Sequence, residues 1–400
     1  MKKILAILLV AMMLLPLIAC SNAGDNNSAE KMKVGFIFLH DENSTYDKNF
    51  IDAAVQACKE MNVTMVQKTQ IPESTKCYDA AVELIESDGC SIIFADSFGH
   101  ESFLMQAAKE HPNVQFCHAT GTQAHTATDL KNFHNAFASI YQGRYAAGVV
   151  AGLKLNEMIA AGKITEEQAK MGYVGAFTFA EVMSGYTSFY LGAKSVCPSV
   201  TMDVKFTGSW YDETKEKQAA EALIAGGCVL ISQHADSMGA PTACENAKVP
   251  NVSYNGSTAA ACPETFLISS RINWVPYFKY MIGQVQNNQP IDVDWTGTLE
   301  TGSVMLTELG KNVAAGTQEK LDEVLTGLKN GTINVFDTAN FTVKGETLTS
   351  YKADVDYDAD FTKDTEVIEN GIFMESKFRS GPYWDIEIDG INLLDRNYGE

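Results

Sequence analysis

Basic residues are scarce in this chain. Its 400 residues include 30 lysines and arginines against 50 aspartates and glutamates, which gives a formal net charge of −20. Nucleic acid and anionic lipid both attract a basic protein face, so neither is expected as the main partner. Proline is also infrequent, with 10 residues, whereas 46% of the chain is hydrophobic. This composition is typical of a globular protein long enough for two domains.

Motifs of metal sites and hydrolases are missing from the sequence. No CxxC pair occurs, and His118, His125 and His234 have no second ligand at helical or hairpin spacing, so no metal is expected. There is no GxSxG elbow and no run of aspartates at a strand end, so neither a catalytic residue nor a cofactor is predicted. Apolar stretches such as GCSIIFA and GCVLIS predict buried free thiols. The cysteines beyond the N-terminal region are Cys58, Cys77, Cys90, Cys117, Cys197, Cys228, Cys244 and Cys262.

The N-terminus carries an export pattern. Lys2 and Lys3 precede an apolar run that is shorter than the ~20 residues a helix needs to span a bilayer. The run ends in LIAC, which resembles a bacterial lipobox. We therefore predict a lipoprotein signal peptide over residues 1–19 and lipidation of Cys20; the alternative is a plain signal peptide with an incidental cysteine.

The segment after Cys20 is small and polar. Residues 20–31 are predicted to form a flexible tether. Removal of Lys2 and Lys3 with the signal changes the net charge from −20 to −22. No later segment is long and apolar enough to cross a membrane. We expect a monomer that is anchored by lipid to the extracytoplasmic face of the cell membrane.

Beyond the tether, short apolar runs alternate with helical patterns. Strands are predicted over 32–39, 63–70, 90–97 and 113–121, and helices over 47–61, 75–86 and 101–110. After a long helix over 141–162 the order repeats, with strands over 171–179, 201–208, 228–234 and 251–256 and helices over 181–195, 212–225 and 239–247. Such alternation predicts an α/β fold of two Rossmann-like lobes, each with a parallel sheet.

The chain is expected to pass between the lobes through a hinge. The strand pattern FLISSRI (Phe266 to Ile272) and the helix from Trp274 to Val285 are predicted to cross back and complete the first sheet. The predicted boundaries are 32–168 plus 266–295 for the first lobe, and 169–265 plus 296–400, including a C-terminal extension, for the second.

Ligands of open parallel sheets bind beyond the carboxyl ends of the strands. In this chain the segments at those positions are rich in aromatic and hydrogen-bonding side chains and nearly lack basic ones. This pattern disfavours a phosphate or carboxylate ligand and favours an uncharged planar one. The candidate ligand-binding residues are Asn43, Tyr46, Ser97, Phe98, Phe177, Trp210, Asp236, Asn255 and Trp274.

Several of these residues have a structural alternative. Trp210, in FTGSWYDETKEK, stands in a short connection where small polar residues are usual, and it either fastens its loop or covers one face of a ring-shaped ligand. Trp274 either contacts ligand or packs between the lobes. Asp212 is expected to cap the following helix, and Asp96 either caps a helix or reaches the ligand.

Most of the region from Met32 to Val285 carries a consistent set of motifs. They include SFGHESFLMQAAKEHPNVQF and ASIYQGRYAAGVVAG, followed by GYVGAF, GSWYDETKEKQAAEALIAGG, ISQHADS and YNGS. In order and spacing they resemble the basic-membrane-protein family, the PnrA-like substrate-binding lipoproteins of ABC importers. The resemblance implies a type I periplasmic-binding-protein fold that closes on a purine nucleoside or nucleobase for an ABC permease, without catalysis. A sensory receptor for the same ligands and an extracytoplasmic nucleoside hydrolase are the alternatives.

The resemblance also implies roles for individual residues. Trp210 would pack on the purine ring, and Asp236 follows the third strand of the second lobe, where the family has an acid. Asn255 stands where an aspartate often holds a ribose hydroxyl. In the loop STYDKNFI, Tyr46 replaces an aspartate and Ile51 an asparagine that are common in nucleoside-binding members. The loss of polar groups leaves nucleoside and free base both open.

Overall fold

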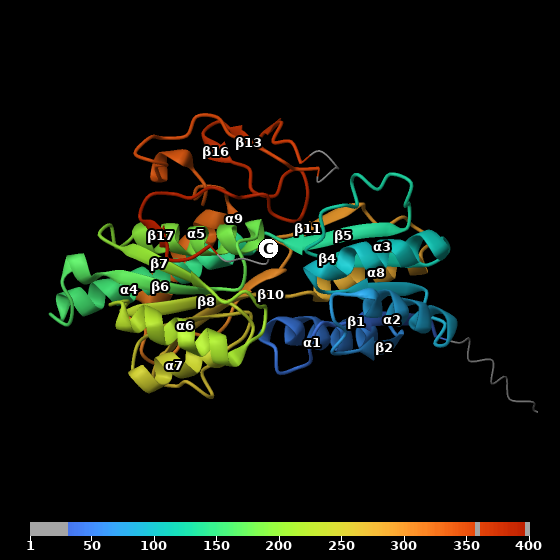
Figure 1. Ribbon diagram of the computed structural model, residues 1–400, viewed down its shortest axis with the longest axis horizontal. Helices are drawn as coiled ribbons and strands as arrows, with labels where there is room; N and C mark the ends of the chain where they lie inside the picture. The colour runs from blue at the N-terminus through green and yellow to red at the C-terminus, as the bar shows by residue number, and fades with distance from the viewer. Residues whose placement is uncertain (1–30, 357–360, 397–400) are drawn as a thin grey trace, which may run out of the picture. The chain divides into compact units, whose positions relative to one another are not determined.

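The computed structural model describes residues 31–356 and 361–396. The predicted signal peptide, the lipidation site Cys20 and tether residues 20–30 lie outside these ranges. Within them, the chain builds two lobes, each on its own sheet (Figure 1). The predicted α/β class, with strands that alternate with helices, is confirmed.

The first lobe has a six-stranded parallel sheet in the order β11-β5-β4-β3-β1-β2. Alternate residues of a strand face opposite layers: Val34 and Phe36 pack with Phe50, whereas Ile37 packs with Leu84. Helices α1 and α8 cover one face, and α2 and α3 cover the other. The strands are β1 (Lys33–Ile37), β2 (Thr64–Lys68), β3 (Ile92–Ala95), β4 (Gln115–Ala119), β5 (Phe133–Ala138) and β11 (Asp294–Gly297). The helices are α1 (Thr45–Glu60), α2 (Thr75–Glu86), α3 (Glu101–Glu110) and α8 (Val275–Gln286), and β3 is followed by the 3₁₀ helix η1 (Phe98–His100).

The second lobe has a seven-stranded sheet in the order β12-β10-β9-β8-β6-β7-β17. Its neighbours pair in parallel except β12, which runs antiparallel to β10. Val174 and Ile231 pack under α6 and α7, whereas Met171 and Tyr173 belong to the core on the other face, with α4 and α5. The strands are β6 (Lys170–Gly175), β7 (Thr201–Phe206), β8 (Leu230–His234), β9 (Asn251–Tyr254), β10 (Phe266–Ile272), β12 (Val304–Leu306) and β17 (Ile391–Leu393). The helices are α4 (Ile140–Ala160), α5 (Ala180–Lys194), α6 (Glu213–Ala225), α7 (Gly239–Ala247) and α9 (Thr317–Lys329), with the 3₁₀ helix η2 (Glu166–Gln168) before β6.

Two parts of the predicted lobe boundaries are wrong. The stretch Phe266–Ile272 was expected to complete the first sheet, but as β10 it pairs with β9 and β12 of the second. The helix over 141–162 was assigned to the first lobe, but α4 packs on α5. The physical cause is the close contact between α4 and α5, which a glycine allows. A Cβ on Gly148 of α4 would lie 2.0 Å from the carbonyl oxygen of Phe189 in α5. The chain therefore passes between the sheets after β5, after β10 and after β11.

The C-terminal extension, residues 331–396 as far as they are described, packs around Trp384. This side chain is buried and stacks on Phe336 with ring centroids 4.3 Å apart. At its end, β17 pairs in parallel with β7, so the extension adds an edge strand to the second sheet. The other elements are η3 (Thr338–Asn340), β13 (Lys352–Ala353), β14 (Thr365–Glu366), β15 (Ile368–Glu369) and β16 (Ile372–Phe373).

The cysteines behave as the apolar stretches predicted. Within the described ranges, all eight are buried free thiols. Burial raises the pKa of Cys117 to about 12 and that of Cys58 to about 11, which keeps them protonated and unreactive. Among the described helices, none is long and apolar enough to cross a membrane.

Candidate functional site

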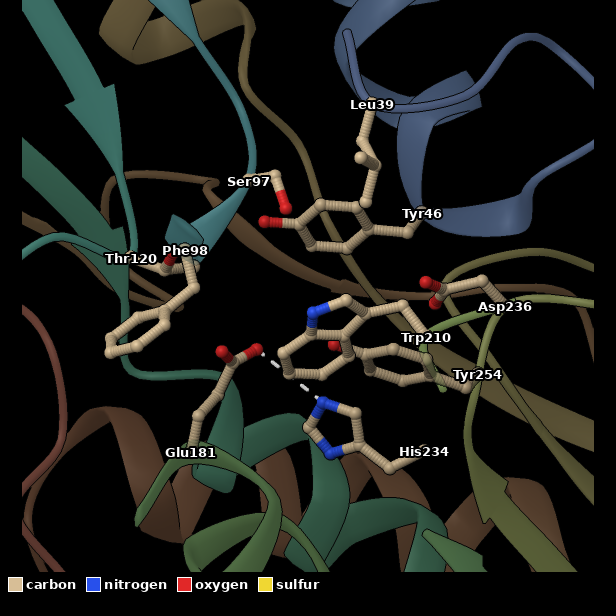
Figure 2. A pocket seen from close by; sticks show the side chains of 10 residues that line it. All are labelled: Leu39, Tyr46, Ser97, Phe98, Thr120, Glu181, Trp210, His234, Asp236 and Tyr254. Carbon is tan, nitrogen blue, oxygen red and sulfur yellow. Dashed lines mark ion pairs between the residues drawn. The ribbon is translucent and has the colours of Figure 1, made fainter. Parts of the chain in front are cut away.

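A cavity lies at the carboxyl ends of strands from both sheets (Figure 2). Its walls come from the segments after β1, β3 and β4 in the first lobe and after β6, β7, β8 and β9 in the second. This is the edge at which parallel sheets bind ligands. Five predicted residues line it: Tyr46, Ser97, Phe98, Trp210 and Asp236. The other lining residues are Leu39, Thr120, Glu181, His234 and Tyr254.

Tyr46 is held in place by the first lobe alone. It lies in the first turn of α1, whose N-cap Ser44 accepts a hydrogen bond from the backbone N–H of Asp47. The Tyr46 hydroxyl donates to the carbonyl oxygen of Asp96 at 2.8 Å, and its ring packs edge-on against Phe50 with centroids 4.8 Å apart. The orientation of the ring at the cavity wall is therefore set before a ligand arrives.

Ser97 and Phe98 follow β3 and bring the first lobe against the second. The Ser97 hydroxyl donates to Glu73 at 2.6 Å, which commits that hydroxyl to the first lobe. The Phe98 ring lies 5.2 Å from the ring of Phe179, which belongs to the second lobe. The aromatic contact therefore closes one side of the cavity across the two lobes.

Trp210 presents its indole ring to the cavity from the second lobe. Its carbonyl oxygen accepts a hydrogen bond from the backbone N–H of Asp236 at 3.0 Å, which ties the loop after β7 to the end of β8. The indole packs edge-on against Phe177 at 5.0 Å, so one face of Trp210 is supported. In Figure 2 the indole lies near the centre of the lining residues, between Tyr46 and His234. The tryptophan thus has support from its own lobe and remains half-buried.

Asp236 supplies a buried carboxyl group. Only 4% of the residue is exposed, and burial raises the pKa of Asp236 well above its usual range, with the charges of Asp47, Glu216 and Glu181 acting in the same direction. The Asp236 carbonyl oxygen accepts a hydrogen bond from the backbone N–H of Thr45 at 3.0 Å, across the lobes. The carboxyl is therefore held at the junction of the two lobes.

Glu181 and His234 form a pair on the wall opposite Tyr46. His234 Nε2 lies 3.4 Å from Glu181 Oε1, and the His234 ring packs on Tyr254 with centroids 4.2 Å apart. Burial lowers the pKa of His234, and Glu181 opposes this shift only in part, so the imidazole is neutral near pH 7. A polar wall without a fixed positive charge suits a ligand that donates hydrogen bonds.

Arg144 lies beneath this wall. Its guanidinium carbon is 4.0 Å from the centroid of Tyr254, and Nη2 donates to the carbonyl oxygen of Gln233 at 3.1 Å. The side chain is fully buried, and within the described part of the chain Nε and Nη1 have no hydrogen-bond partner. It does not line the cavity, so Arg144 supports Tyr254 and His234 from behind.

The chain matches the sequence profile of the family described as ABC transporter substrate-binding protein, PnrA-like, over residues 37–338. This chain belongs to that family. It is 30% identical over 325 residues to a purine-binding protein of Brucella abortus (strain 2308), a match that covers 78% of this chain and 85% of the relative. It is also 30% identical over 251 residues to a putative ABC transporter glucose-binding protein of Haloferax volcanii, covering 62% of this chain and 60% of that protein.

Solved structures support the fold of this PnrA-like chain. A solute-binding protein of an ABC transporter system from Aeropyrum pernix K1 superposes with a TM-score of 0.64 at 16% identity, over 80% of this chain and 94% of that one. At this identity the likeness concerns the fold alone. Together with the two parallel sheets, it confirms the type I periplasmic-binding-protein fold.

Four predicted residues do not line the cavity of this PnrA-like protein. Asn43 is exposed and its amide donates to Asp41, at the rim of a neighbouring hollow. Phe177 lies behind Trp210 and supports it. Asn255 is buried with a left-handed φ of 57°, and its carbonyl oxygen accepts from the Asn49 side chain at 2.8 Å.

Trp274 lies farthest from its predicted role. The residue is 1% exposed and stacks on Phe50, with centroids 4.5 Å apart, inside the core of the first lobe. Because α8 must cover that sheet, the tryptophan that precedes the helix points inward. Asp212 has the capping role expected of it, since Oδ1 accepts from the backbone N–H of Lys215 at 2.9 Å.

Sequence reasoning missed Glu181, His234 and Tyr254 as cavity residues. His234 and Tyr254 are the last residues of β8 and β9, so the same rule that selected Trp210 covers them, whereas Glu181 lies in the first turn of α5. His234 was considered only as a metal ligand or as a surface or core histidine, and not as a cavity residue. Within the described residues, no group of three or more His, Cys, Asp or Glu side chains is placed to hold a metal ion.

Proposed function

We propose that this chain is the extracytoplasmic binding protein of an ABC importer and that it captures a purine nucleoside or nucleobase between its lobes. The observation that carries the proposal is the cavity in which Tyr46 of the first lobe and Trp210 of the second stand near the carboxyl of Asp236. Ring stacking on an aromatic side chain contributes ~1–3 kcal/mol per base. The purine-binding relative at 30% identity supports the same ligand class.

The polar groups of the cavity fit the edge of a purine. Glu181 and Asp236 accept hydrogen bonds, and a purine offers N–H donors in the plane of its ring. No lysine or arginine lines the cavity within the described residues, so a phosphate or carboxylate would have no cation to pair with.

Lobe closure supplies the mechanism of capture. Two hydrogen bonds join the lobes beside the cavity, from Thr45 N–H to the Asp236 carbonyl at 3.0 Å and from the Asn49 amide to the Asn255 carbonyl at 2.8 Å. The ligand meets Tyr46 and Trp210 together only when these lobes are in contact. Binding therefore shifts the population to the closed form, which the permease then receives.

The ligand class is tested by isothermal titration of the refolded, ligand-free protein. We expect saturable binding of at least one purine among adenine, guanine, hypoxanthine and their nucleosides, and no heat with glucose. Saturable binding of glucose, with no heat of binding for any purine, would overturn the proposal in favour of the ligand named for the Haloferax volcanii relative. Mass spectrometry of the small molecule that co-purifies with the protein provides an independent measurement.

Membrane attachment is proposed from the N-terminal sequence, with residues 1–19 as the signal peptide and Cys20 as the acylated residue. Cys20→Ser is expected to abolish incorporation of a labelled fatty acid and to release the protein from the membrane fraction, because the tether then has no anchor. Ser21→Ala, at the next position, should keep both label and location. A labelled, membrane-bound Cys20→Ser protein would contradict the lipid anchor.

A further inference from the structure

The C-terminal extension is built into the second lobe. Its strand β17 pairs with β7, and Asp395 accepts a hydrogen bond from the backbone N–H of Phe206 at 3.0 Å. On α5, the Ser184 hydroxyl donates to Glu375 of the extension at 2.5 Å. Because these contacts tie the extension to a strand and a helix of the second lobe, it moves with that lobe as one body.

One loop of the extension, residues 379–382, reaches across to the first lobe, and we call it the bridging loop. The Ser380 N–H donates to Asp294 Oδ1 at 2.9 Å, and Asp294 is the first residue of β11. A Cβ on Gly381 would lie 3.0 Å from the carbonyl oxygen of Gly121, so the loop also packs on the segment after β4. In Figure 1 the extension, in red, accordingly reaches from β17 toward β11.

Both sides of this contact are held in place by their own lobe. Arg379 is 7% exposed and lies within the bridging loop. Its guanidinium donates, each time at 3.1 Å, to the carbonyl oxygens of Val355, Gly381 and Pro382. On the first lobe, the second oxygen of Asp294 forms an ion pair with His125 at 3.0 Å. The contact therefore joins two surfaces that are already shaped.

The bridging loop lies beside the cleft, at a distance from the crossing of the chain. β11 ends at Gly297, three residues beyond Asp294, which at ~3.3 Å per residue is about 10 Å. Gly381 and Pro382 line a hollow that shares Glu181 with the cavity. Opening of the cleft therefore draws the bridging loop away from the first lobe.

We propose that the bridging loop is a latch that holds the cleft closed and must release the first lobe before the cleft opens. An N–H···O bond requires ~2.7–3.2 Å between N and O, so opening breaks the bond from Ser380 to Asp294. The contact involves no ligand, so it shifts the empty protein toward the closed form. The family profile ends at residue 338, and the latch lies outside the matched region. Only its effect on ligand release rests on the proposed function.

Hydrogen–deuterium exchange of the ligand-free protein measures the latch directly. The Thr45 N–H bonds to the Asp236 carbonyl across the lobes, after β1 and two strands from β4 in the first sheet, so its exchange reports opening at a distance from the latch. Asp294→Ala removes the acceptor of the Ser380 bond and should speed exchange of the Thr45 amide by about tenfold or more. The amides of the buried strand β3 should stay protected, which shows that the variant is folded.

Three further variants separate the latch from a local defect. Asp294→Asn keeps an acceptor oxygen in place and should retain most of the protection. Gly381→Val disturbs the contact from the side of the extension, and combined with Asp294→Ala it should add little, because both changes remove one contact. Asp292→Ala is the matched control, since Asp292 is exposed and lies two residues before Asp294. It should leave the exchange of the Thr45 amide unchanged.

The latch should also slow ligand release. We expect Asp294→Ala to release a bound purine about tenfold faster in stopped-flow fluorescence, because release requires opening. Unchanged exchange at Thr45 in both Asp294→Ala and Gly381→Val would overturn the latch, as would an equal rise in Asp292→Ala. Loss of β3 protection together with that of Thr45 would make the contact a requirement of folding and would overturn it too. If no purine binds the unmodified protein, the proposed function fails, and the exchange result still decides on the latch.

Discussion

Trp210→Ala is expected to lower the affinity for the purine ligand by about 5- to 150-fold, because stacking contributes ~1–3 kcal/mol per base. The protein itself does not need the indole for packing, because Phe177 already supports the loop of Trp210 and Trp210 is only half-buried. Trp210→Phe keeps an aromatic face and should retain most of the affinity. Titration calorimetry gives the affinities, and urea unfolding shows whether each variant is folded.

Tyr211 provides the matched control for this prediction. It is the next residue in the same loop, but it lines the neighbouring hollow and lies 5.3 Å from the ring of His40. Tyr211→Ala should therefore leave purine affinity within about twofold. Equal losses in Trp210→Ala and Tyr211→Ala would mean that the loop needs bulk and not a stacking face, and the ring-binding role of Trp210 would then be abandoned.

The sequence was sufficient for the fold class because the strands are short apolar runs separated by periodic helices. It was not sufficient for the lobe boundaries. The apolar pattern of β10 is compatible with either sheet. β10 belongs to the second sheet because it pairs with β9, and no local sequence pattern specifies that pairing. The same holds for α4, whose place is set by backbone contact at Gly148 and Gly192.

The residues of the candidate site likewise divide into those that the sequence could predict and those that it could not. Trp210 and Asp236 could be predicted because each follows a strand in a segment with more polar or aromatic character than a turn requires. Trp274 satisfied the same criterion but faces the core, since the direction of a side chain at a helix start depends on the layer that the helix covers. Glu181 could not be selected from its own segment, because its role depends on His234, which is distant in sequence.

Glu181 pairs with His234 on the second-lobe wall of the cavity, and Tyr46 faces this pair from the first lobe. Both lobes therefore contribute to one binding surface. Such a surface is complete only in the closed form, which is the requirement for ligand-driven closure.

Asp236→Asn is expected to stabilise the empty protein near pH 7 and, at the same time, to weaken purine binding. Burial raises the pKa of Asp236 well above 3.8, so the folded state holds a proton that the unfolded state releases as the pH rises. The contribution of Asp236 to stability is therefore full below about pH 4 and is lost as the pH rises toward the folded pKa, at ~1.36 kcal/mol for each pH unit between the unfolded and folded pKa values. An amide has no such titration, so the free energy of unfolding of Asp236→Asn in urea should exceed that of the parent at neutral pH and match it more closely at pH 4.

The affinity should change in the opposite direction. The Asp236 carboxyl can release its proton when a ligand binds and then accept a hydrogen bond from a purine N–H through either oxygen. The N–H₂ group of an asparagine cannot become an acceptor, and an unpaired buried polar group that faces a ligand donor costs ~1–3 kcal/mol. We expect purine affinity to fall about 5- to 150-fold in Asp236→Asn. Asp52→Asn is the matched control, because Asp52 is exposed and pairs with Lys48 on the surface of α1, and it should change neither quantity appreciably. If Asp236→Asn lowered stability and left affinity intact, the carboxyl would be a structural group of the lobe junction, and the binding of purine donors would have to be assigned to Glu181 alone.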